Sequence, residues 1–176
     1  MIAAGIDCGA RNTKAVILMN GEIAGKAKVP TGSNPVEAVE TALEKAAASA
    51  GIQRDDVERV VGTGSGRNAV RVADHVVDEI RAMGRGAIHL FPKGRTVVDV
   101  GAEEARAAAL DDRGNVRDSV INEKCAAGAG VFVETMGRAL ETPLEEMGPL
   151  ALTSDRGVAM NAQCAVFAES EVVGLI

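Results

Sequence analysis

Two cysteines in the C-terminal half of the chain have the most distinctive chemistry. Cys125 lies in the run 122–130 and Cys164 in the run 161–170. In both runs an extended pattern changes to a helical one, so each thiol is expected near the positive end of a helix dipole, which favours the thiolate. A 4Fe–4S cluster takes four thiolate ligands. Two symmetry-related chains would supply four, with the cluster on their two-fold axis.

A plainer interpretation of these cysteines is also open. Free cysteine is among the most buried residue types and often serves as a small hydrophobic residue. The spacing of Cys125 and Cys164 lacks the CxxC clustering that marks many metal sites. Spacing alone therefore leaves a cluster ligand and a core residue as alternatives.

The composition limits the class of protein. A chain of 176 residues is expected to form one domain or two small ones, and 47% hydrophobic residues can build a core. A net charge of −6 argues against nucleic acid or an anionic membrane as a partner. The apolar runs are short, which predicts no transmembrane span, and the N-terminus lacks a signal-peptide pattern. Three cysteines in such a chain indicate a reducing, cytoplasmic setting.

Two strands that each end in an aspartate and a glycine turn are the second feature. Asp7 ends a predicted strand and is followed by Gly9, and Asp99 is followed in the same way by Gly101. A carboxylate beside a small-residue turn suits the handling of Mg²⁺ and phosphate, although a plain hairpin would look the same. Two such elements about ninety residues apart indicate half-domains, at 1–94 and 95–176, with one phosphate loop each.

The remaining pattern predicts an α/β fold. Residues 143–149 are expected to form a loop because of their prolines and glycine, and His75 is expected within a helix. Further strands are predicted at 14–19, 22–29, 57–61, 105–110 and 158–160, helices at 35–50, 131–141 and 166–176, and a glycine-rich loop at 62–68.

Several of these segments together resemble the BadF/BadG/BcrA/BcrD ATPase family. The runs 125–130 and 164–172 and the Thr-Gly-Ser-Gly-Arg sequence at 63–67 match its motifs, which recur in family order from residue 5 to the end of the chain. The family includes activators of 2-hydroxyacyl-CoA dehydratases and ATPase subunits of benzoyl-CoA reductase. The resemblance implies the acetate kinase/sugar kinase/Hsp70/actin (ribonuclease H-like) α/β fold.

The resemblance also implies roles for residues of the two loops. The activators carry Gly-Gly-Gln-Asp-x-Lys in the second loop, where Glu103 here replaces a neutral glutamine and adds negative charge near the phosphates. Glu104 can still accept a proton or bind a Mg²⁺-bound water, whereas Cys8 is expected to be a packing residue. The implied catalytic residues are Asp7, Asp99 and Glu104, and the implied nucleotide-binding residues are Gly9, Asn12, Thr13, Lys14, Gly101, Ala102 and Glu103.

The function implied is that of an ATP-dependent electron-transfer component. One 4Fe–4S cluster would be held by Cys125 and Cys164 of each chain in a homodimer, or in a pair with a sister ATPase subunit. Mg²⁺ and ATP, bound at Asp7 and Asp99, would change the angle between the helices near the cysteines. One low-potential electron, obtained from a donor such as ferredoxin or flavodoxin, would then pass to an acyl-CoA dehydratase or an aryl-CoA reductase.

Two other functions stay open from the sequence. A cluster-free kinase or ATP-binding regulator of the same fold would use Asp7 or Glu104 for Mg²⁺ and a hydroxyl substrate, with the cysteines in the core. A non-catalytic assembly subunit is favoured by Glu103 and by the expected incompleteness of the second half-domain. Family members continue beyond the matched segments with an adenosine-binding segment and a C-terminal helix, so the second half-domain is expected to be incomplete.

Overall fold

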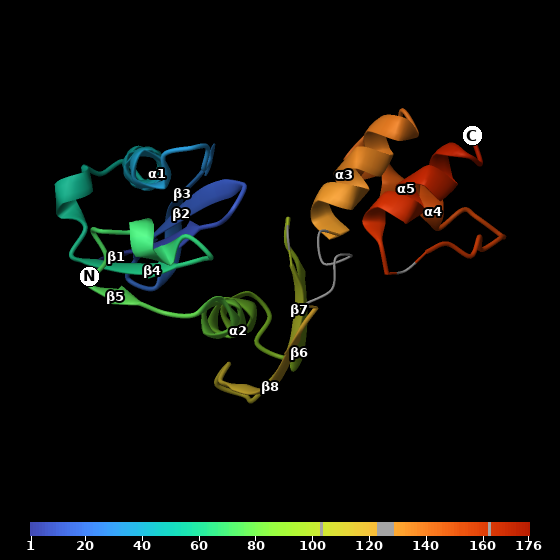
Figure 1. Cartoon of the computed structure of the whole chain (residues 1–176). Coiled ribbons are helices and arrows are strands. Elements are labelled where there is room, and N and C mark those ends of the chain that lie inside the picture. Colours follow the sequence, from blue (N-terminus) through green and yellow to red (C-terminus); the bar gives the residue numbers. More distant parts are fainter. Residues whose placement is uncertain (103, 123–128, 162) are drawn as a thin grey trace. The chain divides into compact units, whose positions relative to one another are not determined.

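The computed structural model describes residues 1–102, 104–122, 129–161 and 163–176 (Figure 1). The chain divides into two compact units. The first, called unit 1, comprises Met1–Gly94 with Asp111–Val116, and the second, called unit 2, comprises Arg95–Leu110 with Arg117–Ile176. Each unit has its own sheet and its own helices, and the two are described separately.

Unit 1 is built on a five-stranded sheet of order β3-β2-β1-β4-β5. The first three strands form an antiparallel meander, and β4 and β5 run parallel to β1. The β2–β3 turn places Asn20 and Gly21 at positive φ, as the Asn-Gly pair predicts. The strands are β1 (Ile2–Cys8), β2 (Asn12–Met19), β3 (Glu22–Pro30), β4 (Arg59–Thr63) and β5 (His75–Val76).

The helix α1 (Pro35–Ser49) packs on this sheet and completes the core of unit 1. Asn34 caps it by accepting a hydrogen bond from the Glu37 N–H, and Pro35 occupies the first turn, where no N–H is needed. At Gly25 in β3, a Cβ would lie against the Ala46 carbonyl and 2.7 Å from the Ala50 nitrogen. Glycine at this position therefore permits the close approach of the helix. The largest fully buried apolar side chains are Ile6, Ile17, Val39 and Leu43.

Short helical turns and one longer helix complete unit 1. The turns η1 (Arg54–Asp56) and η2 (Arg67–Ala69) flank β4, and α2 (Glu79–Leu90) follows β5 with Asp78 as its N-cap. His75 lies in β5, so its predicted helical setting is wrong. Parallel pairing with β4 over two residues, Val61 with His75 and Gly62 with Val76, holds this segment extended.

The carboxylate of Asp74 anchors β5 to the sheet. It accepts a hydrogen bond of 2.7 Å from the Val60 N–H and forms an ion pair with Arg59 at 3.4 Å. The Val60 hydrogen bond, and then the Arg59 charge, lower the pKa of Asp74 below its usual value of 3.8 despite partial desolvation.

Because the folded state lowers this pKa, the Asp74 carboxylate stabilises the fold above pH 3.8, and the contribution is lost as the pH falls through the folded pKa. Asp74→Asn is therefore expected to lower the urea midpoint of unfolding near neutral pH and to have little effect in strong acid. Exposed Asp112 supplies the control, since Asp112→Asn should leave the midpoint unchanged at both pH values. An equal shift at both pH values would contradict a charge-dependent role.

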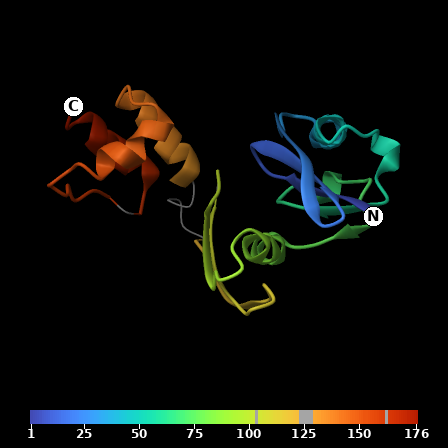
Figure 2. The same ribbon diagram turned by 180° about the vertical axis from the view of Figure 1, so that it is seen from behind.

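In its described residues, unit 2 has a three-stranded sheet of order β6-β7-β8 and three helices. The strands are β6 (Thr96–Val100), β7 (Ala105–Leu110) and β8 (Val116–Ile121), and the helices are α3 (Ala129–Ala139), α4 (Leu144–Ala151) and α5 (Ala165–Val173). Helix α3 contacts both α4 and α5, and Figure 2 shows the α3–α5 pair from the opposite side to Figure 1.

Two sequence expectations for unit 2 are wrong. Residues 143–149 do not form a loop, because α4 begins after Pro143 and contains Pro149 near its end. The helix formers Leu144, Glu145, Glu146 and Met147 outweigh the two breakers in this short helix. Residues 158–160 form no strand. Within the described ranges, no helix has the length and apolar character that a membrane crossing needs.

Candidate functional site

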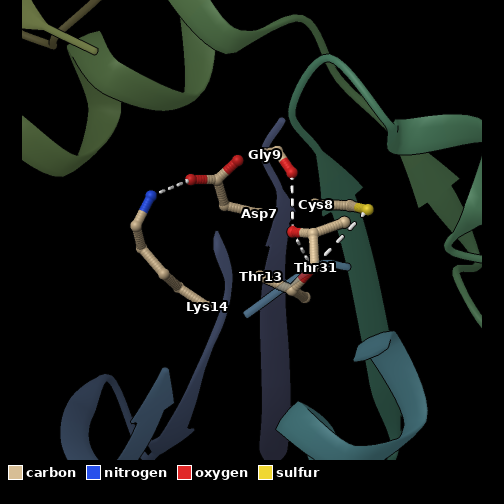
Figure 3. Close-up of polar contacts among 6 residues, drawn as sticks. All are labelled: Asp7, Cys8, Gly9, Thr13, Lys14 and Thr31. Carbon is tan, nitrogen blue, oxygen red and sulfur yellow. Dashed lines mark hydrogen bonds and ion pairs between the residues drawn. The ribbon is translucent and has the colours of Figure 1, made fainter. Parts of the chain in front are cut away.

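The β1–β2 hairpin brings the first set of predicted residues together. In the antiparallel register Asp7 is paired with Lys14, and the Lys14 ammonium lies 2.8 Å from the Asp7 Oδ2 atom (Figure 3). Both side chains are partly exposed, so the ion pair is open to exchange with solvent and ligands. A lysine that can bind phosphate beside a carboxylate that can hold hydrated Mg²⁺ is chemically suited to a metal–nucleotide complex.

The turn between these strands needs a glycine at its first position. The Gly9 N–H donates to the Asn12 carbonyl at 3.1 Å, which closes the turn. A Cβ on Gly9 would lie 2.8 Å from the same carbonyl oxygen, so a larger residue would open it. Ala10 and Arg11 at the tip are exposed, so the backbone of the tip can be approached from solvent.

The glycine-rich segment 63–67 folds over the end of β1. Parallel pairing places Thr63 beside Asp7, and the Gly66 N–H then donates to the Cys8 carbonyl at 2.8 Å. Gly64 has φ +100°, and a Cβ there would lie against that carbonyl and 2.6 Å from the Asp7 Oδ1 atom. This segment therefore belongs to the first loop, although sequence reasoning gave it no site residue. The glycines of this segment were the sequence feature that could have indicated its place in the loop.

Cys8, Thr13 and Thr31 lie beneath the first loop, away from solvent. Cys8 and Thr13 are fully buried and Thr31 is 6% exposed. The Thr31 hydroxyl donates to the Gly9 carbonyl at 2.7 Å and lies 3.0 Å from the Thr13 hydroxyl. The burial of Cys8 confirms its predicted packing role. Thr31 was not predicted as a site residue, and its position 22 residues from Gly9 gives no local signal.

The described residues of the second loop repeat two contacts of the first. Gly101 donates its N–H to the Glu104 carbonyl at 2.8 Å, three residues on, as Gly9 does to Asn12. Asp99 is paired with Arg106 across the β6–β7 hairpin, as Asp7 is with Lys14. Both hairpins thus present an aspartate, a glycine two residues later and a basic residue seven residues later.

The side chains of the second loop are paired differently from those of the first. Arg106 donates to the Glu104 Oε2 atom at 2.9 Å, and its side chain is 13% exposed. Glu104 is more open, with 49% of its side chain exposed, and it remains within reach of a ligand. Ala102 lies in the turn, whereas Glu103 falls outside the described residues.

Helix α3 begins directly against the second loop. The Gly130 N–H donates to the Gly101 carbonyl at 3.2 Å, and a Cβ on Gly130 would lie against the same oxygen and 3.4 Å from the Ala102 Cα atom. Glycine at 130 therefore sets the distance between the loop and the first turn of the helix. A shift of the Gly101 carbonyl would therefore displace the first turn of α3.

Cys164 occupies the N-cap position of α5, in agreement with the predicted change from extended to helical backbone. Its thiol is partly exposed, and within the described residues it makes no capping hydrogen bond. The Asn161 Oδ1 atom accepts hydrogen bonds from the Gln163 and Cys164 N–H groups at 3.0 and 2.7 Å, which fixes the approach to the helix. An accessible thiol at a helix N-terminus fits a thiolate metal ligand.

The second predicted ligand, Cys125, lies outside the described residues. Among the residues that are described, no group of three or more His, Cys, Asp or Glu side chains gathers as a metal site requires.

A model of the BadF/BadG/BcrA/BcrD ATPase family matches residues 4–175, and the chain belongs to this family. It is similar to the activator of lactoyl-CoA dehydratase from Anaerotignum propionicum, with 39% identity over 173 residues, 98% of this chain and 67% of that protein. It is also similar to a benzoyl-CoA reductase subunit from Thauera aromatica, with 31% identity over 180 residues, 99% of this chain and 64% of that protein.

Among solved structures, the chain is similar to the activator of 2-hydroxyisocaproyl-CoA dehydratase from Clostridium difficile with bound ADPNP. The TM-score is 0.86 and the identity 34%, over 99% of this chain and 65% of that one. The fold is therefore that of the acetate kinase/sugar kinase/Hsp70/actin class, as predicted. The chain spans about two thirds of the length of these relatives.

Proposed function

We propose that this chain is an ATP-dependent electron-transfer component that activates a 2-hydroxyacyl-CoA dehydratase or serves an aryl-CoA reductase. The observation that carries the proposal is the 39% identity to a dehydratase activator, which covers 98% of the chain. Three similar proteins are named as activators of acyl-CoA dehydratases, and a fourth is named as a subunit of benzoyl-CoA reductase. A cytoplasmic setting, with ferredoxin or flavodoxin as the electron donor, belongs to the same proposal.

The two hairpins support the nucleotide part of the proposal. In each, a carboxylate stands at the strand end beside a turn whose backbone a phosphate oxygen can approach. Asp7 and Asp99 are proposed to hold the water shell of Mg²⁺, and Lys14 to exchange its partner Asp7 for a phosphate. Glu104 is proposed to orient the attacking water. The half-domains 1–94 and 95–176 are proposed to contribute one loop each.

The remaining loop residues are proposed to act through their backbone. Glycine at 9 and 101 keeps each turn closed by an i to i+3 hydrogen bond, which aligns the N–H groups that follow. Asn12 and Thr13 begin the return strand of the first hairpin, and Ala102 lies in the turn of the second. Glu103, which lies outside the described residues, is proposed to act with Ala102.

The cysteines support the electron-transfer part. Cys164 has the exposure and the helix N-cap position that suit a thiolate ligand. With Cys125 it would give two ligands per chain, so a homodimer or a pair with a sister subunit would hold one 4Fe–4S cluster. The cluster, when bound, supplies one electron at low potential. The Gly101–Gly130 contact offers a route by which the nucleotide state reaches α3, the helix that follows Cys125 in the sequence.

An activation assay tests the proposal. The anaerobically reconstituted and reduced chain, mixed with an acyl-CoA dehydratase such as that of the Anaerotignum relative, is expected to start dehydration with Mg²⁺ and ATP. Neither ADP nor the non-hydrolysable ADPNP should sustain it, because the transfer is coupled to hydrolysis. ATP hydrolysis without any reduction of the dehydratase or of an aryl-CoA reductase would favour the cluster-free kinase or regulator.

A further inference from the structure

Three buried side chains form a continuous hydrogen-bonded chain beneath the first loop (Figure 3). The Thr31 hydroxyl lies 2.7 Å from the Gly9 carbonyl oxygen and 3.0 Å from the Thr13 hydroxyl. The Thr13 hydroxyl in turn lies 3.7 Å from the Cys8 sulfur, within hydrogen-bonding distance for sulfur. The residues come from three different strands or their ends, so this series of hydrogen bonds joins β1, β2 and the end of β3.

The chemistry of the groups determines which one donates and which one accepts in each of these hydrogen bonds. A carbonyl oxygen can only accept, so the single Thr31 proton points to Gly9. Thr31 must then accept from Thr13, which uses the single Thr13 proton. The Thr13 hydroxyl could also donate to the Cys8 sulfur at 3.7 Å, but its one proton is already used in the shorter contact with Thr31. We therefore assign the Cys8 S–H, a weak donor, to the Thr13 oxygen.

We propose that Thr31, supported by Thr13 and Cys8, is a positioning residue that aims the peptide between Gly9 and Ala10 at a bound phosphate. In a planar trans peptide the C=O and N–H point in opposite directions, and the chain has no cis peptide bond in its described part. With the Gly9 oxygen held toward Thr31, the Ala10 N–H is directed away from the buried side. Ala10 is exposed, and among the described residues no acceptor occupies its N–H.

This inference rests on the proposed nucleotide site. It adds the residues that fix the direction of one hydrogen-bond donor of that site, the Ala10 N–H, before the nucleotide binds. The backbone of Thr31 is tied separately, through its N–H to the Arg11 carbonyl at 3.0 Å. A change of the Thr31 side chain alone therefore leaves the loop attached, while it frees the Gly9–Ala10 peptide to rotate and removes the acceptor of the Thr13 hydroxyl.

The direction of the chain is tested by infrared spectroscopy of the S–H stretch. The difference spectrum between wild type and Cys8→Ala isolates the Cys8 band. In the wild type this band is expected at the lowered frequency of a donating thiol, and Thr13→Val should move it to higher frequency. A wild-type band already at the free-thiol frequency, unmoved by Thr13→Val, would overturn the assigned direction. This infrared measurement is made without nucleotide.

The positioning role is tested by calorimetric titration of the full chain with Mg²⁺ and ADPNP. Thr31→Val is expected to weaken binding roughly tenfold, the equivalent of one charge-assisted hydrogen bond. Thr31→Ser keeps the hydroxyl and should restore affinity, and Thr153→Val, at an exposed threonine of unit 2, should leave it unchanged.

The outcomes separate this inference from the proposed function. If Thr31→Val binds as tightly as wild type, or if Thr31→Ser is as weak as Thr31→Val, the positioning role is wrong. If the wild type itself binds neither ADPNP nor ATP, the proposed function fails, and the positioning role fails with it. The infrared result then still decides the direction of the hydrogen-bonded chain.

Discussion

Replacing Gly64 by alanine is expected to destabilise unit 1 by about 3 kcal/mol or more and to abolish nucleotide binding. The φ of +100° at this position costs a residue with a side chain about 1–3 kcal/mol. The new Cβ would lie against the Cys8 carbonyl and 2.6 Å from the Asp7 Oδ1 atom, and such overpacking costs about 1–3 kcal/mol more. Backbone and carboxylate must both move to relieve it.

The loss of binding follows from the atoms that are displaced. Asp7 and the end of β1 carry the proposed Mg²⁺ and phosphate contacts, so a shift there misplaces both. Urea unfolding and ADPNP titration measure the two effects. Gly86→Ala in α2 is the matched control, because a Cβ there meets nothing within 4 Å and should stabilise the helix by about 0.5–1 kcal/mol. A Gly64→Ala protein as stable as wild type would contradict the described loop conformation.

Replacing Cys164 by serine is expected to remove all bound iron and to separate the two chains. Serine has nearly the same shape, but its hydroxyl is not the soft thiolate ligand that the cluster needs. Because both chains of a symmetric dimer carry the substitution, the shared cluster loses two of its four ligands. The N-cap of α5 should survive, since serine is a favoured N-cap residue and Asn161 still holds the preceding backbone. The effect is therefore expected on the metal and not on the fold.

The control for this variant is a cysteine of the same chain that cannot reach a metal. Cys8 is fully buried in unit 1, so Cys8→Ser should keep the iron content of the wild type. Iron content and solution mass, both measured under anaerobic conditions, distinguish the two variants. Retention of iron by Cys164→Ser would contradict its role as a ligand.

Much of the architecture could be predicted because its signals are local. The alternation of buried residues in β1 and β2, the Asn20-Gly21 turn and the Asn34-Pro35 helix start each depend on neighbouring residues. The family motifs added the fold, which the structural similarity confirms. Helix α4 was missed because its prolines and glycine are ordinarily breakers.

The parts of the site that were missed depend on strand pairing over long distances. Thr31 reaches Gly9 because β3 pairs with β2, so that Asn12 lies beside Pro30. Gly64 and Gly66 reach Asp7 and Cys8 because β4 is parallel to β1. No spacing along the chain encodes these contacts. The assigned roles of Asp7, Asp99, Glu104 and the two cysteines remain predictions.

The central claim is that two chains share one cluster through Cys125 and Cys164. The most direct test is the iron and sulfide content of the anaerobically reconstituted wild-type chain, measured together with its mass in solution. The account predicts about four irons and four sulfides for each pair of chains, with the pair as the species in solution. Iron-free protein, or a full cluster on a single chain, would contradict it.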